Sequence, residues 1–510
     1  MQQHWRRGFA AVAFAFAMQG CSSEPSAPPL PTLNLDLREI TVSGISSGGF
    51  MAVQFGVAHS EAVKGVAVTA GGPYFCAGDA GVSTAIARCM QGDPMFPAQP
   101  ITDADLDRMT SSTRAWAEQG RIDSISALTR QQVWIFHGTN DGTVKRPVTD
   151  ALAAYYRTFV PEHQIFYKRD LPAGHAQISA VCTVGERDVC TPCANTGGRF
   201  INACAEDAEH PERLYDPFAS ALQQFYGRLA PPTSAPSESL HRFDQRPYVL
   251  EKDKPLSPKK ISLADTGYLF LPQACRDGAP CRLHIAFHGC QQYAGKIGLD
   301  FVQASRLNDW AESNRLVVLY PQTTASTFAP ANPGGCWDWW GYNDASGDMT
   351  GRYATKDGAQ IAAIWRMVEA LAGKGEQWTD SASDAKPELV MLDRSFDQAL
   401  LAWRPIPFAQ SYSVFRRPSD TLPPDSSRRA STLIFLAQLT HGQGFTGLTF
   451  ADHGLDAQTE YIYHVCVKNT CTEAITLRTA AQPPACDPYF SMFQGKPVDR
   501  NNQPTNVVCP

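Results

Sequence analysis

Short, mainly apolar runs alternate with stretches of helical period from Leu37 to Ala372. Val63–Thr69 is an apolar run of the kind that forms a buried strand, whereas Asp103–Glu118 has the spacing of an amphipathic helix. This alternation predicts an α/β fold in which helices cover a mostly parallel sheet. Further strands are predicted at Ile40–Val42, Val133–His137, Gln164–Lys168, Gly267–Leu271, Arg282–Phe287 and Leu316–Tyr320, and further helices at Phe50–His59, Ala151–Tyr156, Pro217–Leu229, Phe301–Asn314 and Ala359–Ala372.

A different pattern begins at Glu388, where short strands with a period of two predict an all-β sandwich. The run of apolar and polar positions from Phe450 to Val465 resembles the closing half of a fibronectin type III module. In that resemblance, Tyr461 occupies the place of the tyrosine corner. The sandwich strands are predicted at Ala399–Trp403, Tyr412–Arg416, Leu433–Leu439 and Tyr461–Val467.

The N-terminus reads as a targeting segment. Arg6 and Arg7 precede a short apolar run, Phe9–Met18, which is too short to span a bilayer and predicts a signal peptide. Cys21 fits a lipoprotein cleavage site, so a lipid anchor at this residue is one alternative to free secretion. The paired arginines also fit a twin-arginine signal, although less well. We therefore expect a secreted or periplasmic protein whose contact with a membrane is limited to lipidation of Cys21.

These patterns divide the chain into six segments with different expected structures. They are a signal peptide at 1–21, a Pro- and Ser-rich tether at 22–36, the α/β domain at 37–372, a polar linker at 373–386, the fibronectin type III-like domain at 387–480 and a C-terminal tail at 481–510.

The composition excludes some classes of partner. The chain has 510 residues with 18% charged and 43% hydrophobic residues, which is an ordinary globular balance. Its net charge of −6 is mild, and no basic block indicates nucleic acid as a partner. We expect a monomer that acts on a small or polymeric substrate.

The cysteines indicate disulfide bonds. Of 15 cysteines, Cys21 belongs to the leader, and an even number remains in an exported chain. Cys190-Thr-Pro-Cys193 has the spacing of a zinc knuckle or a redox pair, but no second such motif accompanies it, so we favour a structural bridge. Local pairs are predicted at Cys76–Cys89, Cys275–Cys281, Cys466–Cys471 and Cys486–Cys509.

The stretch Thr41–Met51 contains the motif G-x-S-x-G around Ser46, between a predicted strand and a predicted helix. This context is typical of a nucleophile elbow, in which the serine adopts positive φ and small residues stand two positions away on each side. Gly44 and Gly48 fill those positions. The elbow also directs the N–H of Ser47 to the place where an oxyanion would form. The alternative is an ordinary Gly- and Ser-rich loop.

Asp141 and His175 complete a candidate triad with Ser46. Each follows a predicted strand, and the chain order Ser, Asp, His is that of α/β-hydrolases. Carboxyl ends of parallel strands meet at one sheet edge, so we expect the three side chains to converge. His137 and His288 are competing histidines, and a turn-capping aspartate and a surface histidine are the structural alternatives.

A second oxyanion donor normally comes from a His-Gly loop that precedes the nucleophile, but only the leader and tether precede Ser46. The segment His288-Gly289-Cys290 has this chemistry and follows a strand far downstream. A circularly permuted α/β-hydrolase, in which the chain begins at the nucleophile strand, reconciles both observations. The N–H groups of Ser47 and Cys290 would then form the oxyanion hole, and the helix end near Gly373 would lie where the nucleophile strand is entered.

Four motifs stand in order along the α/β domain: GISSGGFMA at 44–52, GGPYFC at 71–76, HGCQQ at 288–292 and NPGGCWDWWGY at 332–342. Together they resemble the polyhydroxybutyrate depolymerase family, over roughly Leu37–Ala372. The resemblance implies a serine esterase that hydrolyses polyester chains without a metal or organic cofactor. It assigns Ser46, Asp141 and His175 as the triad and Ser47 and Cys290 as oxyanion donors, and it implies a Cys290–Cys336 bridge.

Trp337, Trp339 and Trp340 lie in the last of these motifs. At least one of them is expected to pack into the core, and at least one to provide an apolar wall for an acyl chain. Three other functions remain open. They are a feruloyl or acetyl esterase acting on plant polysaccharides, a broad polyester hydrolase, and a non-catalytic binding protein, which the intact triad argues against.

Overall fold

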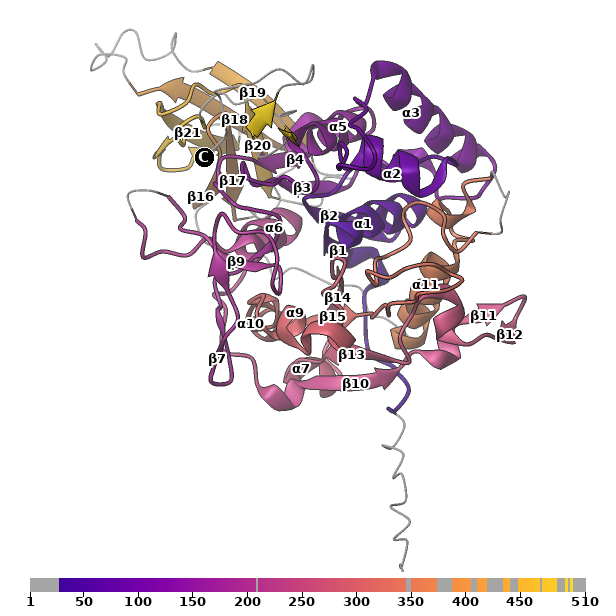
Figure 1. Cartoon of the computed structure of the whole chain (residues 1–510). Coiled ribbons are helices and arrows are strands. Elements are labelled where there is room, and N and C mark those ends of the chain that lie inside the picture. Colours follow the sequence, from indigo (N-terminus) through magenta and orange to yellow (C-terminus); the bar gives the residue numbers. More distant parts are fainter. Residues whose placement is uncertain are drawn as a thin grey trace, which may run out of the picture.

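The computed structural model describes residues 27–207, 210–344, 350–373, 388–404, 411–419, 434–440, 448–467, 470–483, 491–493 and 496–498. The predicted signal peptide, Cys21 and the predicted Cys486–Cys509 bridge lie outside these residues. The described chain forms a helix-covered sheet followed by an all-β unit (Figure 1). None of the described helices is long and apolar enough to cross a membrane.

The larger unit is built on an eight-stranded sheet in the order β10-β13-β15-β14-β1-β2-β3-β4. All pairings from β15 to β4 are parallel, whereas β13 runs antiparallel to both of its neighbours. The predicted bounds of β2, β14 and β15 are confirmed. The strands are β1 (Ile40–Ile45), β2 (Val63–Thr69), β3 (Gln132–Phe136), β4 (Ile165–Lys168), β10 (Leu240–Asp244), β13 (Thr266–Phe270), β14 (Arg282–Phe287) and β15 (Leu316–Tyr320).

The chain enters this sheet in the middle. It first builds β1 to β4 toward one edge and then returns to build the other half from β10 to β15. The two ends of the unit meet, because Gly373 N–H donates to the Leu33 carbonyl (2.9 Å) and Leu33 N–H donates to the Leu371 carbonyl (2.8 Å). A chain joined at this contact would first build the half of the sheet that contains β10, β13, β14 and β15 and would then continue from β1 to the β4 edge. The topology thus supports the hypothesis of circular permutation.

Helices cover both faces of the sheet (Figure 1). Because successive strand residues point to opposite faces, Val66 joins one core and Ala67 the other. The helices on the first face are α1 (Ser47–Ala58), α2 (Gly81–Cys89), α3 (Asp103–Glu118), α5 (Arg146–Arg157) and α11 (Ala359–Leu371), and those on the second are α6 (Pro217–Tyr226), α9 (Asp300–Gln303) and α10 (Leu307–Ser313).

The prediction of one helix over Phe301–Asn314 is wrong. The helix breaks between α9 and α10 at Arg306, which has a left-handed φ of 58°. Asn308 explains how the break is tolerated, because its side-chain amide donates to the Val302 carbonyl at 2.9 Å. This carbonyl would accept from the Arg306 N–H in a continuous helix. The spacing of apolar residues continues across the break, so the sequence pattern does not reveal the break.

The segment between β4 and α6 has little apolar period, and its small sheets were not predicted. Two disulfides, Cys182–Cys190 and Cys193–Cys204, hold it. Cys190 and Cys193 therefore belong to two separate structural bridges and form neither a bond with each other nor a redox pair. The remaining short elements are α4 (Ile125–Leu128), β5 (Gln177–Ile178), β6 (Thr183–Val184), β7 (Arg187–Asp188), β8 (Thr191–Pro192), β9 (Ile201–Ala203), β11 (Leu250–Glu251), β12 (Lys254–Pro255), α7 (Gln273–Arg276), α8 (Ala294–Ile297), β24 (Ser491–Phe493) and β25 (Lys496–Val498).

The C-terminal unit is a sandwich of two sheets. A three-stranded sheet, β16-β17-β20, stands beside a five-stranded sheet, β19-β18-β21-β22 with β23 on β21. Tyr461, the predicted tyrosine corner, accepts a hydrogen bond at its hydroxyl from the Asp456 N–H (2.9 Å), which is the upstream backbone contact of that corner. The strands are β16 (Leu389–Arg394), β17 (Gln398–Trp403), β18 (Ser411–Pro418), β19 (Ile434–Thr440), β20 (Thr449–His453), β21 (Glu460–Val467), β22 (Thr470–Cys471) and β23 (Ile475–Arg478).

The sandwich packs against the β4 edge of the large sheet (Figure 1). Gln398 accepts the backbone N–H of Tyr167 at 2.9 Å, which satisfies a donor of this edge strand. Leu400 and Ala451 of the sandwich are buried in the same apolar core as Trp134 and Phe225. The sandwich is therefore part of one packed body with the sheet.

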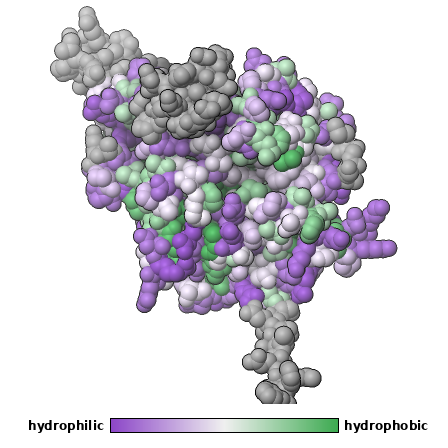
Figure 2. Space-filling view, viewed as in Figure 1, coloured by the Kyte–Doolittle hydropathy of each residue, from purple (hydrophilic) through white to green (hydrophobic). Residues whose placement is uncertain are grey.

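Further disulfides follow the predicted pattern. Cys76–Cys89, Cys275–Cys281 and Cys466–Cys471 are present as predicted from spacing, and Cys290–Cys336 is present as the family resemblance implies. On the face shown in Figure 2, hydrophobic residues form small groups among hydrophilic ones. The large apolar side chains that are most exposed among the described residues are Val82, Met95, Leu214, Phe328 and Met391.

Candidate active site

Ser46 lies at the sharp turn between β1 and α1. Its φ of 56° and ψ of −123° are a strained conformation that a non-glycine residue adopts only where its surroundings impose it. The Ser46 N–H donates to the Thr69 carbonyl at 3.0 Å, which ties the turn to β2. A Cβ atom on Gly44 would lie 2.0 Å from the Gly48 carbonyl oxygen, so the turn requires glycine there. This is the predicted strand–turn–helix geometry of a nucleophile elbow.

Asp141 and His175 come together at the ends of β3 and β4. The Asp141 carboxylate accepts a hydrogen bond from His175 Nδ1 at 2.8 Å, and both side chains are buried. The other carboxylate oxygen accepts the backbone N–H groups of Thr143 (2.9 Å) and Val144 (3.1 Å). Burial by itself would raise the pKa of Asp141, but the neighbouring His175 and these donors hold it below its ordinary value. The carboxylate is therefore ionised and fixed in orientation.

The two loops that carry this pair are joined by their backbones. Thr139 N–H donates to the Leu171 carbonyl (2.8 Å), and Asn140 N–H donates to the Ala173 carbonyl (3.1 Å). A Cβ on Gly138 would lie 2.1 Å from the Ala173 oxygen, so the loops approach as closely as glycine permits. The Asp141 and His175 loops therefore form one rigid unit.

The competing histidine His137 has a different environment. Its ring is buried, and Nε2 donates to the Val144 carbonyl at 3.0 Å. Burial lowers its pKa, so the ring stays neutral. The histidine that is hydrogen-bonded to Asp141 is His175, as the sequence order predicts.

The two predicted oxyanion donors stand at adjoining turns. The Ser47 N–H is the first of α1 and has no acceptor inside the helix. Gly48 packs against the end of β14. A Cβ atom on Gly48 would lie 2.3 Å from the Phe287 carbonyl oxygen and 2.4 Å from the His288 carbonyl oxygen. This close approach places the start of α1 beside the turn that contains Cys290. In the described part of the chain, the Cys290 N–H has no acceptor either.

His288 fixes the peptide that presents the Cys290 N–H. Its Nδ1 donates to the Gly289 carbonyl at 2.8 Å, and its Nε2 accepts the Thr323 N–H at 3.2 Å. Because the carbonyl and the N–H of a trans peptide point in opposite directions, a carbonyl held by His288 directs the Cys290 N–H away from that ring. Burial lowers the pKa of His288 to about 4, so the ring is neutral at ordinary pH. This role was not predicted, because the sequence motif shows only that a histidine precedes the glycine.

The three tryptophans of this loop differ in burial. Trp337 is fully buried against Phe287 and His288, which confirms that at least one tryptophan packs into the core. Trp339 is 5% exposed and stacks on Phe50, with ring centroids 4.1 Å apart. Trp340 is half-buried at the edge of this cluster.

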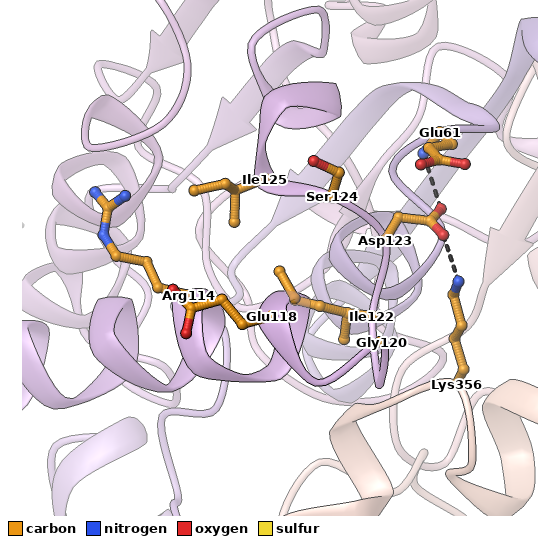
Figure 3. A pocket seen from close by; sticks show the side chains of 10 residues that line it. Glu61, Arg114, Glu118, Gly120, Ile122, Asp123, Ser124, Ile125 and Lys356 are labelled. Atoms are coloured by element: carbon orange, nitrogen blue, oxygen red, sulfur yellow. Dashed lines mark hydrogen bonds and ion pairs between the residues drawn. The ribbon is translucent and has the colours of Figure 1, made fainter.

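A cavity of about 430 Å³ opens elsewhere on the molecule (Figure 3). It is lined by Glu61, Asp123 and Lys356 among others, and Asp123 and Lys356 form an ion pair in it. Glu61 lies between the C-terminal end of α1 and the start of β2, which is the amino edge of the sheet. The cavity is therefore at the opposite edge from Ser46. In the described residues, no cluster of three or more His, Cys, Asp or Glu side chains has a geometry that could hold a metal.

Comparisons with known proteins agree on one class of relative. The chain is 33% identical to the poly(3-hydroxybutyrate) depolymerase of Delftia acidovorans over 465 residues, which cover 89% of this chain and 81% of that protein. It is 30% identical to the polyhydroxybutyrate depolymerase of Talaromyces funiculosus over 374 residues, which cover 71% of this chain and 98% of that protein. No family model matches.

Solved structures give the same result. The crystal structure of the PHB depolymerase from Penicillium funiculosum superposes with a TM-score of 0.56 at 29% identity, over 68% of this chain and all of that chain. A serine-to-alanine variant of a PHB depolymerase in complex with an R3HB trimer superposes with a TM-score of 0.55, again at 29% identity and over 68% of this chain and all of that chain.

Proposed function

Because this chain belongs to the polyhydroxybutyrate depolymerase family of carboxylic ester hydrolases, we propose that it is an exported serine esterase that cleaves polyesters such as poly(3-hydroxybutyrate) through an acyl-enzyme. One observation carries the proposal. The hydrogen bond between His175 and Asp141 lies at the same sheet edge as the strained turn at Ser46. This set can activate a hydroxyl for attack on an ester.

The first half of the reaction transfers the acyl group to the enzyme. Ser46 Oγ attacks the ester carbonyl carbon while His175 Nε2 takes the hydroxyl proton, and the carbonyl π electrons move to oxygen. Asp141 holds the His175 tautomer with its proton on Nδ1 and stabilises the imidazolium that forms. Collapse of the tetrahedral intermediate breaks the ester C–O bond, and the leaving alcohol takes the proton from Nε2. In the second half, water repeats these steps with Ser46 as the leaving group.

The backbone supplies the stabilisation of the oxyanion. The N–H groups of Ser47 and Cys290 point at the developing charge, and each such donor is typically worth about 10²–10³ in rate. The Ser47 N–H gains further strength because it stands at the positive end of α1. The His288 contact and the Cys290–Cys336 bridge hold the second donor in place before substrate arrives. Such preorganisation avoids the cost of reorienting dipoles during the reaction.

The substrate and the cellular location follow from different observations. The solved relative with an R3HB trimer supports a hydroxyalkanoate chain as substrate, and the half-buried Trp340 is the residue that we assign to the acyl-chain wall. The six disulfides among the described residues support an oxidising compartment outside the cytoplasm. We propose that the protein is a monomer whose signal peptide directs its export. After export it is either free or tethered by a lipid at Cys21.

The nucleophile is tested with Ser46→Ala. We expect ester hydrolysis to fall by several orders of magnitude with an unchanged melting temperature, and a serine-directed phosphonate to label the wild type and fail to label the variant. His175→Ala should be almost as damaging, and the double variant little worse, because the residues act as a unit. His137→Ala is the matched control, since it removes a buried histidine beside Asp141 that makes no hydrogen bond to it. A folded Ser46→Ala enzyme with wild-type turnover would overturn the mechanism.

The substrate is tested with a panel. Polyhydroxybutyrate film, soluble aryl esters and feruloylated xylan should be compared with one enzyme preparation. We expect the film and the aryl esters to be hydrolysed and the xylan ester to be left intact. Release of ferulate at a higher kcat/KM than the hydroxybutyrate ester would replace the polyester assignment with the polysaccharide one.

A further inference from the structure

Gln292 joins two parts of the candidate machinery that come from opposite halves of the chain. Its side chain is 1% exposed and uses both ends of its amide. The Oε1 atom accepts the Gly289 N–H at 2.8 Å, in the turn that presents the Cys290 N–H. The Nε2 atom donates to the carbonyls of Phe200 (2.8 Å) and Arg199 (3.2 Å), in the segment that follows His175.

The Phe200 carbonyl is also an acceptor for the loop that carries His175 (the histidine loop). It also accepts the backbone N–H of Gln177 at 2.8 Å, two residues after His175. Phe200 itself has a left-handed φ of 54°, and its ring meets the His175 ring edge-on with centroids 6.4 Å apart. The carbonyl is thus held in place by Gln292 from one side and by the histidine loop from the other.

The resulting chain of hydrogen bonds is short. It runs from the Gly289 N–H to Gln292 Oε1, and from Gln292 Nε2–H to the Phe200 carbonyl, where the Gln177 N–H also ends. Gln177 begins β5, which pairs with β9 just after Phe200, but the turn at Gly289 belongs to no strand, so among the described residues no strand ladder joins this turn to the segment after His175. The side-chain amide of Gln292 therefore sets the distance between the turn at 289–292 (the oxyanion turn) and the loop that carries His175.

We propose that Gln292 is a positioning residue that fixes the second oxyanion donor relative to His175. This inference rests on the proposed function, because it assigns roles to Cys290 and His175. Without the amide, the Gly289 N–H loses its acceptor, and the Phe200 carbonyl loses one of its two donors and keeps only the Gln177 N–H. The Cys290 N–H can then move away from the position where it would donate to the oxyanion. The ester itself still binds, since no contact to it has been removed.

The test is Gln292→Met, which keeps the length and burial of the side chain and removes both polar ends. The matched control is Gln131→Met. Gln131 is also fully buried and donates from Nε2 to two carbonyls, those of Gly56 (2.7 Å) and Val63 (3.0 Å), but it lies at the amino edge of the sheet. Both variants should lower the melting temperature, so the loss of stability alone does not distinguish them.

The expected difference is in catalysis of a soluble aryl ester of 3-hydroxybutyrate. Gln292→Met should lower kcat about 10- to 100-fold with KM within about twofold of the wild type, which is less than the loss of a whole oxyanion donor. Labelling by the phosphonate should slow by a similar factor, because that reaction uses the same hole. Gln131→Met should change neither rate. Wild-type kcat in folded Gln292→Met, or an equal loss in Gln131→Met, would overturn the inference.

A second variant covers the case in which Gln292→Met does not fold. Gln292→Glu keeps an acceptor for the Gly289 N–H but turns a carboxylate oxygen toward the Phe200 and Arg199 carbonyls. Its kcat should fall at least as far as that expected for Gln292→Met, whereas unchanged kcat in a folded Gln292→Glu enzyme would refute the positioning role. Ser46→Ala separates the two proposals. If Ser46→Ala is inactive while the Gln292 variants are unimpaired, only the present inference fails, and if Ser46→Ala is active the proposed function fails with it.

Discussion

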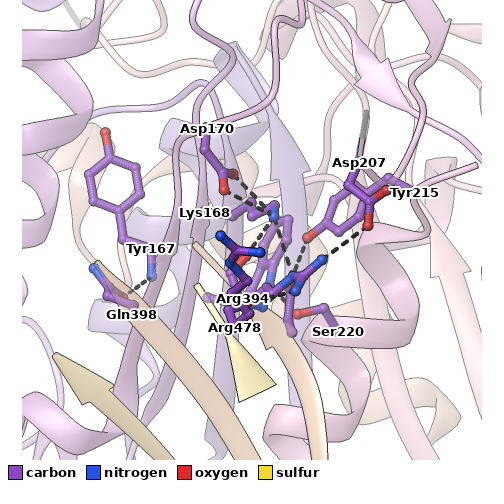
Figure 4. A network of polar contacts seen from close by, with 11 residues as sticks. Tyr167, Lys168, Asp170, Asp207, Tyr215, Ser220, Arg394, Gln398 and Arg478 are labelled. Carbon is purple, nitrogen blue, oxygen red and sulfur yellow. Dashed lines mark hydrogen bonds and ion pairs between the residues drawn. The ribbon is translucent and has the colours of Figure 1, made fainter. Parts of the chain in front are cut away.

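Replacement of Lys168 by Met should show that the sandwich supports the histidine loop. Lys168 ends β4, a few residues before His175, and lies beside Asp170 (Figure 4). Its side chain is only 4% exposed. It contacts the carboxylates of Asp170 (3.1 Å) and Asp393 (3.7 Å) and donates to the Arg394 carbonyl (2.6 Å). Asp393 and Arg394 belong to β16 of the sandwich, so one cation joins the two units.

The size of the effect follows from burial. Asp170 is 3% exposed and Asp393 is 7% exposed, so loss of the ammonium leaves two carboxylates without water to replace it. Breaking a buried ion pair on one side typically costs about 3–5 kcal/mol. Burial by itself would lower the pKa of Lys168, but the two carboxylates raise it above its ordinary value, so the cation is present at any pH of interest. We therefore expect a free energy of unfolding lower by roughly this amount.

The assay compares Lys168→Met with Lys64→Met. Lys64 is 7% exposed and pairs with Glu39 at 2.8 Å, but it lies at the amino edge of the sheet. Both variants should unfold at lower denaturant, whereas only Lys168→Met should lower kcat on a soluble ester, by about tenfold at most, through the loop that places His175. Equal kcat in the two variants at a temperature where both are folded would refute the idea that this network supports the site.

Two further predictions follow from the same structure. Asp338 is buried beneath three backbone N–H donors, and burial raises its pKa to about 7, so its contribution to stability is full below about pH 4 and is lost as the pH rises through about 7. The free energy of unfolding, measured by denaturant titration from pH 4 to pH 8, should fall with pH by a few kcal/mol in the wild type and change less in Asp338→Asn, and equal slopes would contradict the buried carboxyl. Deletion of residues 388–510 should lower the melting temperature and the soluble-ester kcat/KM, because it uncovers Gln224, Tyr167 and Lys168, all of which hydrogen-bond to the sandwich. A deletion variant with wild-type stability and kcat/KM would show instead that the sandwich is separable.

The sequence predicted those parts of the site that local chemistry encodes. The turn at Ser46 needs glycine on both sides, so a five-residue motif identifies it. Asp141 and His175 each follow an apolar strand, and parallel strands bring their carboxyl ends to one edge. The bounds of β2, β14, β15 and α3 were predicted correctly, because no residue with left-handed backbone interrupts their apolar periods.

The parts that were not predicted depend on contacts between distant residues. The left-handed break at Arg306 is stabilised by Asn308, and the apolar period continues through it. Cys182 and Cys204 pair with the two cysteines of the C-x-x-C motif, and spacing alone does not distinguish this arrangement from a bridge within the motif. The sequence patterns also place the sandwich in a separate segment from the α/β domain. Its buried contacts to β4 argue against this separation.

These two classes of interaction have different roles at the candidate site. In the proposed mechanism, the local turns determine which atoms react, because each motif fixes a single backbone geometry within a few residues. The long-range contacts determine how those atoms stand relative to one another, since Ser46, His175 and Cys290 come from different loops. His288 and Gln292 hydrogen-bond to the turn that contains Cys290, and Lys168 joins the end of β4 to the sandwich. Substitutions in the first class should therefore remove the chemistry altogether, whereas those in the second should reduce kcat by one or two orders of magnitude and leave KM nearly unchanged.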